Sequence, residues 1–288
     1  MPLAHLLLAL AALFWAGNVL LGRALHQDFP PVALAFWRWS VATLILLPFT
    51  WRHLRRDLRG LVEAWPSLLA LSVLGISTFN TLLYQAAHTT TATNIALIQT
   101  LMPAAIVALD LLLFSQRISP RRTLGVVVAM SGGAFVVLRG DPAALGDVDL
   151  VPGDLWMMMA IVVYAGYSVL LRRRPDVHPL SFLAASFLLG SLLLLPLHLG
   201  EFAFRGGPTW SGGLVAGIAY VAVFPSILAY LFWNRGVALL GAGAAGLYIC
   251  LVPIFTAVLA VPMLGESLHS FHLVGFGLIA CGILLFRR

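Results

Sequence analysis

Polar and aromatic side chains recur near the middle of long apolar stretches of this sequence. An amide in hydrocarbon needs a hydrogen-bond partner, so Asn18, Asn80 and Gln99 are expected to face a protein interior or a wet cavity. Aromatic rings at a similar depth could bind a small organic molecule, although core packing is the alternative for each ring alone. The candidate binding residues are Trp15, Asn18, Phe79, Asn80, Gln99, Met102, Tyr164, Tyr167, Tyr220 and Tyr248. We assign Trp51, Trp65, Trp210 and Trp233 to the aromatic belts at the membrane surfaces.

Two prolines stand in the middle of apolar stretches, 150 residues apart. Pro103 and Pro253 lack the N–H that would bond the carbonyls four residues earlier, at Gln99 and Ile249. Freed carbonyls at corresponding positions of two repeats indicate a substrate site near the middle of the membrane. An ordinary helix kink is the alternative interpretation.

Two charged residues fall inside apolar stretches. Arg38 would lie about 10 Å below the surface by the helical rise, so it must reach a water-filled vestibule or find carbonyl partners. Structural anchoring and ligand attraction both remain open for Arg38. Asp110 lies near the other surface, and we expect it to pair with Arg117 or Arg121.

Several motifs for other chemistry are missing. No Asp or Glu falls at the middle of an apolar stretch, so no carboxylate is placed to carry protons. Gly241, Gly243 and Gly246 fit GxGxxG but follow no strand, and small residues that allow close helix packing explain them better. Walker A, HExxH and GxSxG patterns are absent, so we predict no cofactor, no metal site and no enzymatic activity.

The composition requires membrane helices to position these residues. Of 288 residues, 61% are hydrophobic and only 10% are charged, which is too little polar surface for a soluble domain. Strand-like alternation is absent, so the expected fold is an all-α membrane protein. The net charge of +6 is interpreted as a topology signal rather than as a nucleic-acid surface.

Ten segments are long and apolar enough to cross about 30 Å of hydrocarbon. They cover residues 3–22, 31–50, 66–87, 92–115, 121–138, 155–171, 179–199, 210–234, 241–262 and 270–286. With both termini in the cytoplasm, 13 of the 17 basic residues fall on that side and 3 on the other. This bias over short loops supports ten spans with both termini in the cytoplasm.

The two halves of the chain repeat each other. At an offset of 150 residues, Leu101, Pro103 and Gly125 correspond to Leu251, Pro253 and Gly275. We therefore divide the chain into a first repeat at 1–140, an outer loop at 141–152 and a second repeat at 153–288. Five spans in each half predict two inverted repeats, a plan common among secondary transporters.

The order of these residues resembles tandem EamA domains, the ten-helix plan of the drug/metabolite transporter superfamily. The resemblance rests on Trp15-Ala16-Gly17-Asn18, Pro31, Phe36, Arg38, Pro103, Gly125 and Gly132, and then on Ala238, Pro253, Gly265-Glu266, Gly275 and Gly282. Within the family, the chain looks most similar to YddG-type exporters of aromatic and other neutral amino acids. One departure is Ser115-Gln116, which stands where Gly-Glu is usual.

The resemblance implies an exporter of the bacterial inner membrane, with a central cavity between two five-helix halves. Because no coupling carboxylate is found, we expect an alternating-access uniporter for neutral amino acids or similar small metabolites. The alternatives are a proton-coupled drug or metabolite efflux transporter and a non-transporting structural or regulatory membrane subunit. The expected partners are a small-molecule substrate and the lipid bilayer, not nucleic acid. The sequence leaves the oligomeric state open.

Overall fold

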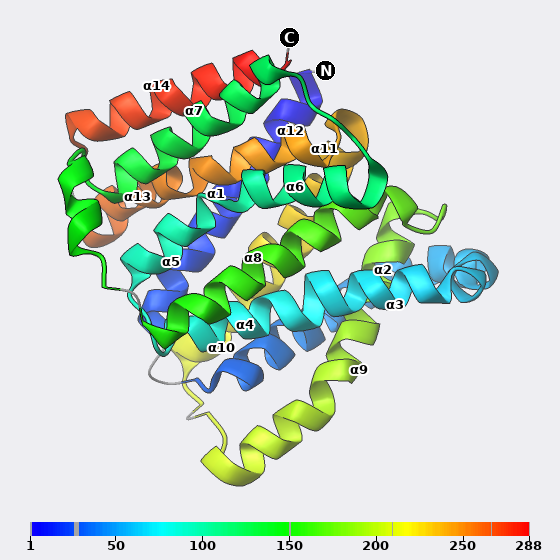
Figure 1. Ribbon diagram of the computed structural model, residues 1–288. Helices are drawn as coiled ribbons and strands as arrows, with labels where there is room; N and C mark the ends of the chain where they lie inside the picture. The colour runs from blue at the N-terminus through cyan, green and yellow to red at the C-terminus, as the bar shows by residue number, and fades with distance from the viewer. Residues whose placement is uncertain (1, 26–28, 150, 209, 266, 288) are drawn as a thin grey trace.

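The computed structural model describes residues 2–25, 29–149, 151–208, 210–265 and 267–287, and these fold as helices joined by short turns (Figure 1). The first half contains α1 Pro2–Leu25, α2 Pro31–Glu63, α3 Trp65–Ser72, η1 Val73–Thr78, α4 Phe79–Ala87, α5 Ala92–Gln99, α6 Met102–Phe114 and α7 Pro120–Val137. A short helix, η2 Pro142–Asp147, follows in the connection. The second half contains α8 Pro152–Leu170, η3 Leu171–Arg173, α9 Pro179–Arg205, α10 Gly212–Ala222, η4 Val223–Leu228, α11 Ala229–Leu240, α12 Ala242–Gly246, η5 Leu247–Leu251, α13 Val252–Leu264 and α14 Ser270–Arg287.

These elements give the ten spans that the apolar stretches predict. Among the described residues, 8 segments are long and apolar enough to cross a membrane, and Ser270–Phe286 is a shorter apolar helix. We count α7 as the tenth span because it is the counterpart of α14 in the repeat, although its first turn carries Arg121 and Arg122. Large apolar side chains also lie on the outer surface, such as Leu112 and Leu273, each 75% exposed. Lipid rather than water is the solvent that such a surface favours.

The two halves repeat each other element by element. The π-helical turn η1 at Val73–Thr78 has its counterpart in η4 at Val223–Leu228, and α6 and α7 have theirs in α13 and α14. Packing follows the same relation: α1 contacts α11 and α13, as α8 contacts α4 and α6. Because five spans separate equivalent positions, the halves run in opposite directions through the membrane. The fold is therefore two five-helix inverted repeats.

Glycines allow α7 and α14 to pack closely across this pseudo-symmetry (Figure 1). A Cβ atom on Gly125 would lie 2.7 Å from the carbonyl oxygen of Gly282. A Cβ atom on Gly132 would lie 2.8 Å from the carbonyl oxygen of Gly275. The Gly125–Gly282 and Gly132–Gly275 contacts are equivalent, because Gly275 and Gly282 are the repeats of Gly125 and Gly132. Small residues at such crossings let helix backbones touch in a membrane.

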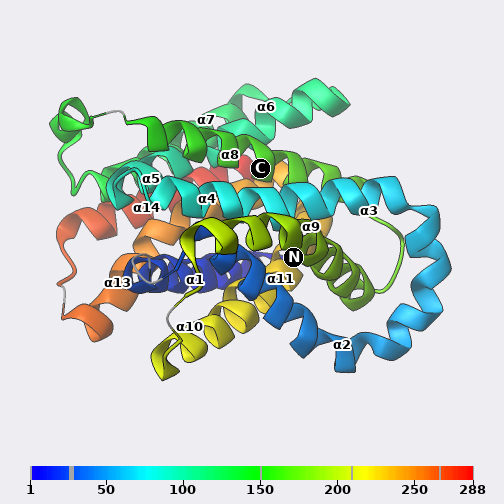
Figure 2. The ribbon, with the colours of Figure 1, turned by 90° about the horizontal axis from the view of Figure 1, so that it is seen from below.

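Two sequence expectations are corrected by the helix boundaries. The second span does not end near residue 50, because α2 continues to Glu63 and carries the arginine cluster on helix rather than on loop. Figure 2 shows this extension beside α3 at the edge of the bundle. The fourth span is not one kinked helix, because α5 ends at Gln99 and α6 begins at Met102.

Candidate functional site

A central cavity of about 50 Å³ lies where the two repeats meet. Residues from α1, α2, α4, α5, α6, α8, α11 and η5 line it, so every part of its wall depends on packing between spans. Its lining residues are Trp15, Asn18, Val19, Arg38, Phe79, Asn80, Leu83, Ile95, Gln99, Met102, Tyr164, Tyr230 and Ile249.

Arg38 is the charged residue of this cavity, and its side chain is only 1% exposed. Its Nε donates to Ser226 Oγ at 2.7 Å, and Nη2 donates to the Pro225 carbonyl at 2.9 Å. Its Nη1 donates to Tyr84 Oη at 2.9 Å and to Asn18 Oδ1 at 3.4 Å. All of these acceptors are neutral. The buried guanidinium is therefore solvated by dipoles rather than by a carboxylate.

The π-helical turn η4 supplies two of the four acceptors for Arg38. Pro225 lies within this turn, and its carbonyl also accepts from Trp15 Nε1 at 3.2 Å. Ser226 Oγ donates in turn to the Val221 carbonyl at 2.6 Å. A π turn and a proline both disturb the regular helical bonding, which makes backbone carbonyls accessible to side chains. The irregular turn thus holds Arg38 at the cavity wall.

Aromatic rings form another part of the wall. The ring centre of Tyr164 lies 4.5 Å from that of Phe79, 5.8 Å from that of Trp15 and 6.4 Å from that of Tyr230. Tyr164 is 2% exposed, and its hydroxyl has no hydrogen-bond partner among the described residues. A buried hydroxyl without a partner is costly, so it is a free group that a ligand could engage.

The two prolines begin helices instead of bending them. Pro103 and Pro253 lie in the first turns of α6 and α13, where a missing N–H costs little. Pro103 cannot donate to the Gln99 carbonyl, and the N–H groups of Thr100 and Leu101 bond earlier carbonyls. The expectation of a freed carbonyl at Ile249 is wrong. The chain there forms the tighter 3₁₀ turn η5, and the N–H of Val252 donates to the Ile249 carbonyl.

The structure brings most of the predicted binding residues together. Seven of the ten line the cavity, and Arg38 joins them. The other three lie elsewhere: Tyr167 donates to Asn234 Oδ1 at 2.7 Å, Tyr220 stacks on Phe224, and the hydroxyl of Tyr248 bonds His5 Nδ1. Each of these three fills space between helices outside the cavity lining.

Two aromatic residues of the central cluster were not among the predicted binding residues. Tyr230 lines the cavity, and Trp233 lies 5.2 Å from Trp15, ring centre to ring centre. Trp233 is fully buried, so its assignment to a membrane belt is wrong, whereas Trp51, Trp65 and Trp210 are exposed. The signal that could have found Tyr230 is the repeat, because Tyr230 lies 150 residues after Asn80.

Two further expectations concern charged and terminal residues. Asp110 pairs with Arg172 rather than with Arg117 or Arg121, which ties α6 to the end of α8. Ser115 ends α6 in the left-handed conformation with φ of 55°, as Gly265 ends α13 with φ of 70°. Glu266, which follows Gly265 in the Gly-Glu pair of the family resemblance, lies outside the described residues.

Comparison with known proteins decides the family. Residues 2–138 and 151–288 each match the EamA-like transporter family. The chain belongs to this family. As an EamA-like protein with many apolar spans, it is a multi-pass membrane protein of a transporter family.

Individual relatives of this EamA-like chain are also transporters by name. The uncharacterized transporter YyaM of Bacillus subtilis is 30% identical over 89% of this chain and 84% of its own length. An uncharacterized transporter of Archaeoglobus fulgidus is 30% identical over 98% and 96%. A probable terminal-alkyne amino-acid exporter of Streptantibioticus cattleyicolor is 25% identical over 98% and 92%. A solved crystal structure shares the fold with a TM-score of 0.78, at 20% identity over 98% of this chain and 95% of the other.

Proposed function

We propose that this protein exports aromatic and other neutral amino acids, or similar small metabolites, by uncoupled alternating access. The observation that carries the proposal is Arg38, a fully buried cation at the cavity wall. Among the described residues, the ion pairs are Arg59–Glu63 and Arg172–Asp110, so Arg38 has no carboxylate partner there. A buried charge held only by neutral groups is poised to gain most from an incoming anion.

The carboxylate of an amino acid fits this position. Its oxygens would replace or supplement the weak contact that Arg38 Nη1 makes with Asn18 Oδ1 at 3.4 Å. The side chain of the substrate would lie among Trp15, Phe79 and Tyr164, whose rings already pack edge to face and at a tilt. The ammonium would meet an aromatic face or the Gln99 carbonyl. Similarity to a probable amino-acid exporter supports this substrate class.

Movement of the two repeats is needed for binding. The cavity of about 50 Å³ is much smaller than the roughly 300 Å³ of a typical ligand pocket. Spans must therefore separate on one side to admit a substrate and on the other to release it. The interrupted segments α5–α6 and α12–η5–α13 occupy equivalent places in the repeats and are suited to that movement.

The remaining features of the proposal concern the membrane. The cavity lining has no Asp or Glu, which favours a uniporter over a proton-coupled efflux transporter. We also propose a bacterial inner membrane with both termini in the cytoplasm, and repeats at 1–140 and 153–288 joined by an outer loop at 141–152. The arginine bias between loops supports this orientation.

The test is transport of labelled phenylalanine in proteoliposomes containing the full chain. We expect Arg38→Gln to weaken transport by about thirtyfold or more, because loss of a buried charge contact costs about 2 kcal/mol or more. Arg38→Lys should keep part of the activity, since the charge stays but the planar fork is lost. Arg205→Gln, at the exposed end of α9, is the control.

The outcomes separate a binding role from a structural one. Thermal unfolding of each variant reports whether the protein is folded in the membrane. Full transport by a folded Arg38→Gln protein would overturn the role of Arg38. No transport of any amino acid by the wild-type protein would overturn the substrate class.

A further inference from the structure

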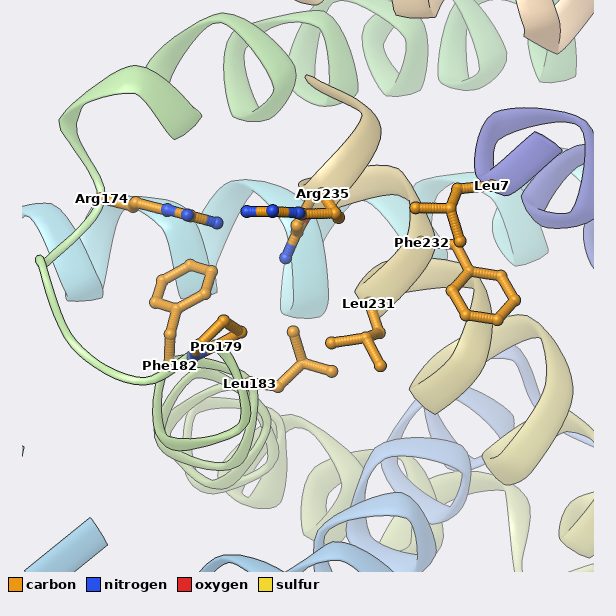
Figure 3. A pocket seen from close by; sticks show the side chains of 9 residues that line it. Leu7, Arg174, Pro179, Phe182, Leu183, Leu231, Phe232 and Arg235 are labelled. Carbon is orange, nitrogen blue, oxygen red and sulfur yellow. The ribbon is translucent and has the colours of Figure 1, made fainter. Parts of the chain in front are cut away.

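A second cavity, of about 250 Å³, lies away from the central site. It is formed where α9 begins, beside the first half of α11 and the first turns of α1 (Figure 3). Its lining residues are Leu7, Arg174, Pro179, Phe182, Leu183, Leu231, Phe232, Asn234 and Arg235. The proposed export function uses none of these side chains.

Two arginines give this cavity an unbalanced positive charge. In Figure 3 the guanidinium groups of Arg174 and Arg235 point toward one another at one side of the cavity. Within the part of the chain that the structure describes, neither makes an ion pair with a carboxylate. Two cations that converge without an anion repel each other, and a bound oxyanion would relieve that repulsion.

Asn234 provides a third donor in the same lining. The residue is 4% exposed, and its Oδ1 accepts from the hydroxyl of Tyr167 at 2.7 Å. Its Nδ2 is buried and has no hydrogen-bond partner among the described residues. Tyr167 thus fixes the amide with its NH₂ group unsatisfied. A buried donor without an acceptor is the expected condition of an empty anion site.

The rest of the cavity wall is apolar. Leu183 and Leu231 lie below the arginines, and Leu7 and Phe232 lie to the right of them, in the view of Figure 3. A free inorganic anion would gain nothing from such a wall, whereas a lipid can place its phosphate at the arginines and its hydrocarbon along these side chains. Basic pockets between membrane helices on the cytoplasmic side are suited to anionic lipid headgroups.

We propose that Arg174, Arg235 and Asn234 form a binding site for the phosphate of an anionic phospholipid. The site lies at the end of the bundle where the arginine bias places the cytoplasm. It joins α9 to α11 and α1. The inference does not require that the protein transports amino acids.

Native mass spectrometry of the full-length protein tests the proposal. The protein is purified from bilayers of equal parts phosphatidylglycerol and phosphatidylcholine, and the ratio of the two retained lipids is measured. We expect wild-type protein to retain phosphatidylglycerol preferentially. Arg174→Gln and Arg235→Gln should each lower that preference about fivefold, the effect of one cation near a lipid phosphate. Arg235→Lys should retain most of it.

The control removes one positive charge from the far end of α9. Arg205→Gln should leave the lipid ratio unchanged, because Arg205 ends α9 whereas the site lies at its beginning. An equal loss in Arg205→Gln would assign the preference to general surface charge and overturn the site. Unchanged retention in folded Arg174→Gln and Arg235→Gln proteins would overturn it as well. Displacement of the lipid by inorganic phosphate alone would replace it with a site for free oxyanions.

Discussion

At the scale of single residues, Arg38 and Tyr164 show how the cavity differs from a packed core. Arg38 is held by the carbonyl and hydroxyl groups of η4, and Tyr164 keeps a buried hydroxyl without a partner. A core selected for stability alone would place an apolar side chain at either position. Both residues therefore fit a site whose polar groups are completed by a ligand.

Ser115 is a position where the residue type does not suit the backbone conformation. Its φ of 55° is left-handed, a conformation that costs a non-glycine residue about 1–2 kcal/mol. Gly265 adopts the same conformation at the equivalent place in the second repeat. We predict that Ser115→Gly stabilises the protein by about 1 kcal/mol after the entropy cost of glycine is included.

The matched substitution should act in the opposite direction. Gly265→Ala should destabilise the protein by about 1 kcal/mol, because the left-handed strain exceeds the gain from a stiffer unfolded chain. Both changes are measured by reversible unfolding in detergent micelles. A destabilised Ser115→Gly protein would mean that the serine side chain makes a contact worth more than the backbone strain.

At the scale of helices, the sequence predicted the spans well and their internal irregularities poorly. Apolar length is enough to locate a membrane helix, so the ten segments fall on helices. Hydropathy carries no information about where a helix continues beyond the membrane, as α2 does to Glu63. It also cannot distinguish a kinked helix from two helices, as at Pro103.

The chemistry of each side chain explains which site residues could be predicted. Asn18, Asn80 and Gln99 were grouped in space because amides in hydrocarbon must face a protein interior or a wet cavity. Tyr230 and Trp233 were not grouped with them, although Tyr230 follows η4 as Asn80 follows η1. An aromatic ring suits a membrane surface, a packed core or a cavity, so tertiary packing decides where it lies.

The crossing of α7 and α14 gives a prediction about helix packing. A Cβ atom on Gly282 would lie 2.6 Å from the carbonyl oxygen of Gly125 and 2.7 Å from Ala129 Cβ. Gly282→Ala should therefore force the helices apart and destabilise the protein by about 2 kcal/mol. The backbone cannot move aside as a flexible side chain could.

A glycine on the same helix serves as the control. A Cβ atom on Gly277 would meet no atom within 4 Å, so Gly277→Ala should be neutral or slightly stabilising. The two variants are compared by thermal unfolding under identical conditions. Equal stability of both would show that α7 and α14 can separate without loss.

At the scale of the whole molecule, the inverted repeat suits the alternating access that we propose. Contacts of α1 with α13 repeat as contacts of α8 with α6, so the packing that closes one side has an equivalent on the other. Exchanging which set of contacts is open would expose the same cavity to the opposite surface. Such an exchange needs little net energy because the two arrangements are alike.

The charge balance of this exchange predicts how transport responds to gradients. A zwitterion adds no net charge, and the cavity lining offers no carboxylate to carry a proton alongside it. We therefore expect labelled phenylalanine to leave proteoliposomes at the same rate with and without a pH gradient. An imposed membrane potential should have no effect either, because the charge of Arg38 stays with the protein.

A substrate analogue makes this prediction independent of the gradient measurement. Phenethylamine keeps the aromatic ring and the ammonium of phenylalanine but lacks the carboxylate, so it would bring a second cation to Arg38. We expect it neither to be transported nor to compete with phenylalanine, because two like charges in a buried cavity repel strongly. Efflux of phenylalanine that stops when the pH gradient is removed would instead indicate proton coupling. Equal transport of phenethylamine would show that Arg38 does not bind the carboxylate, even if export itself is observed.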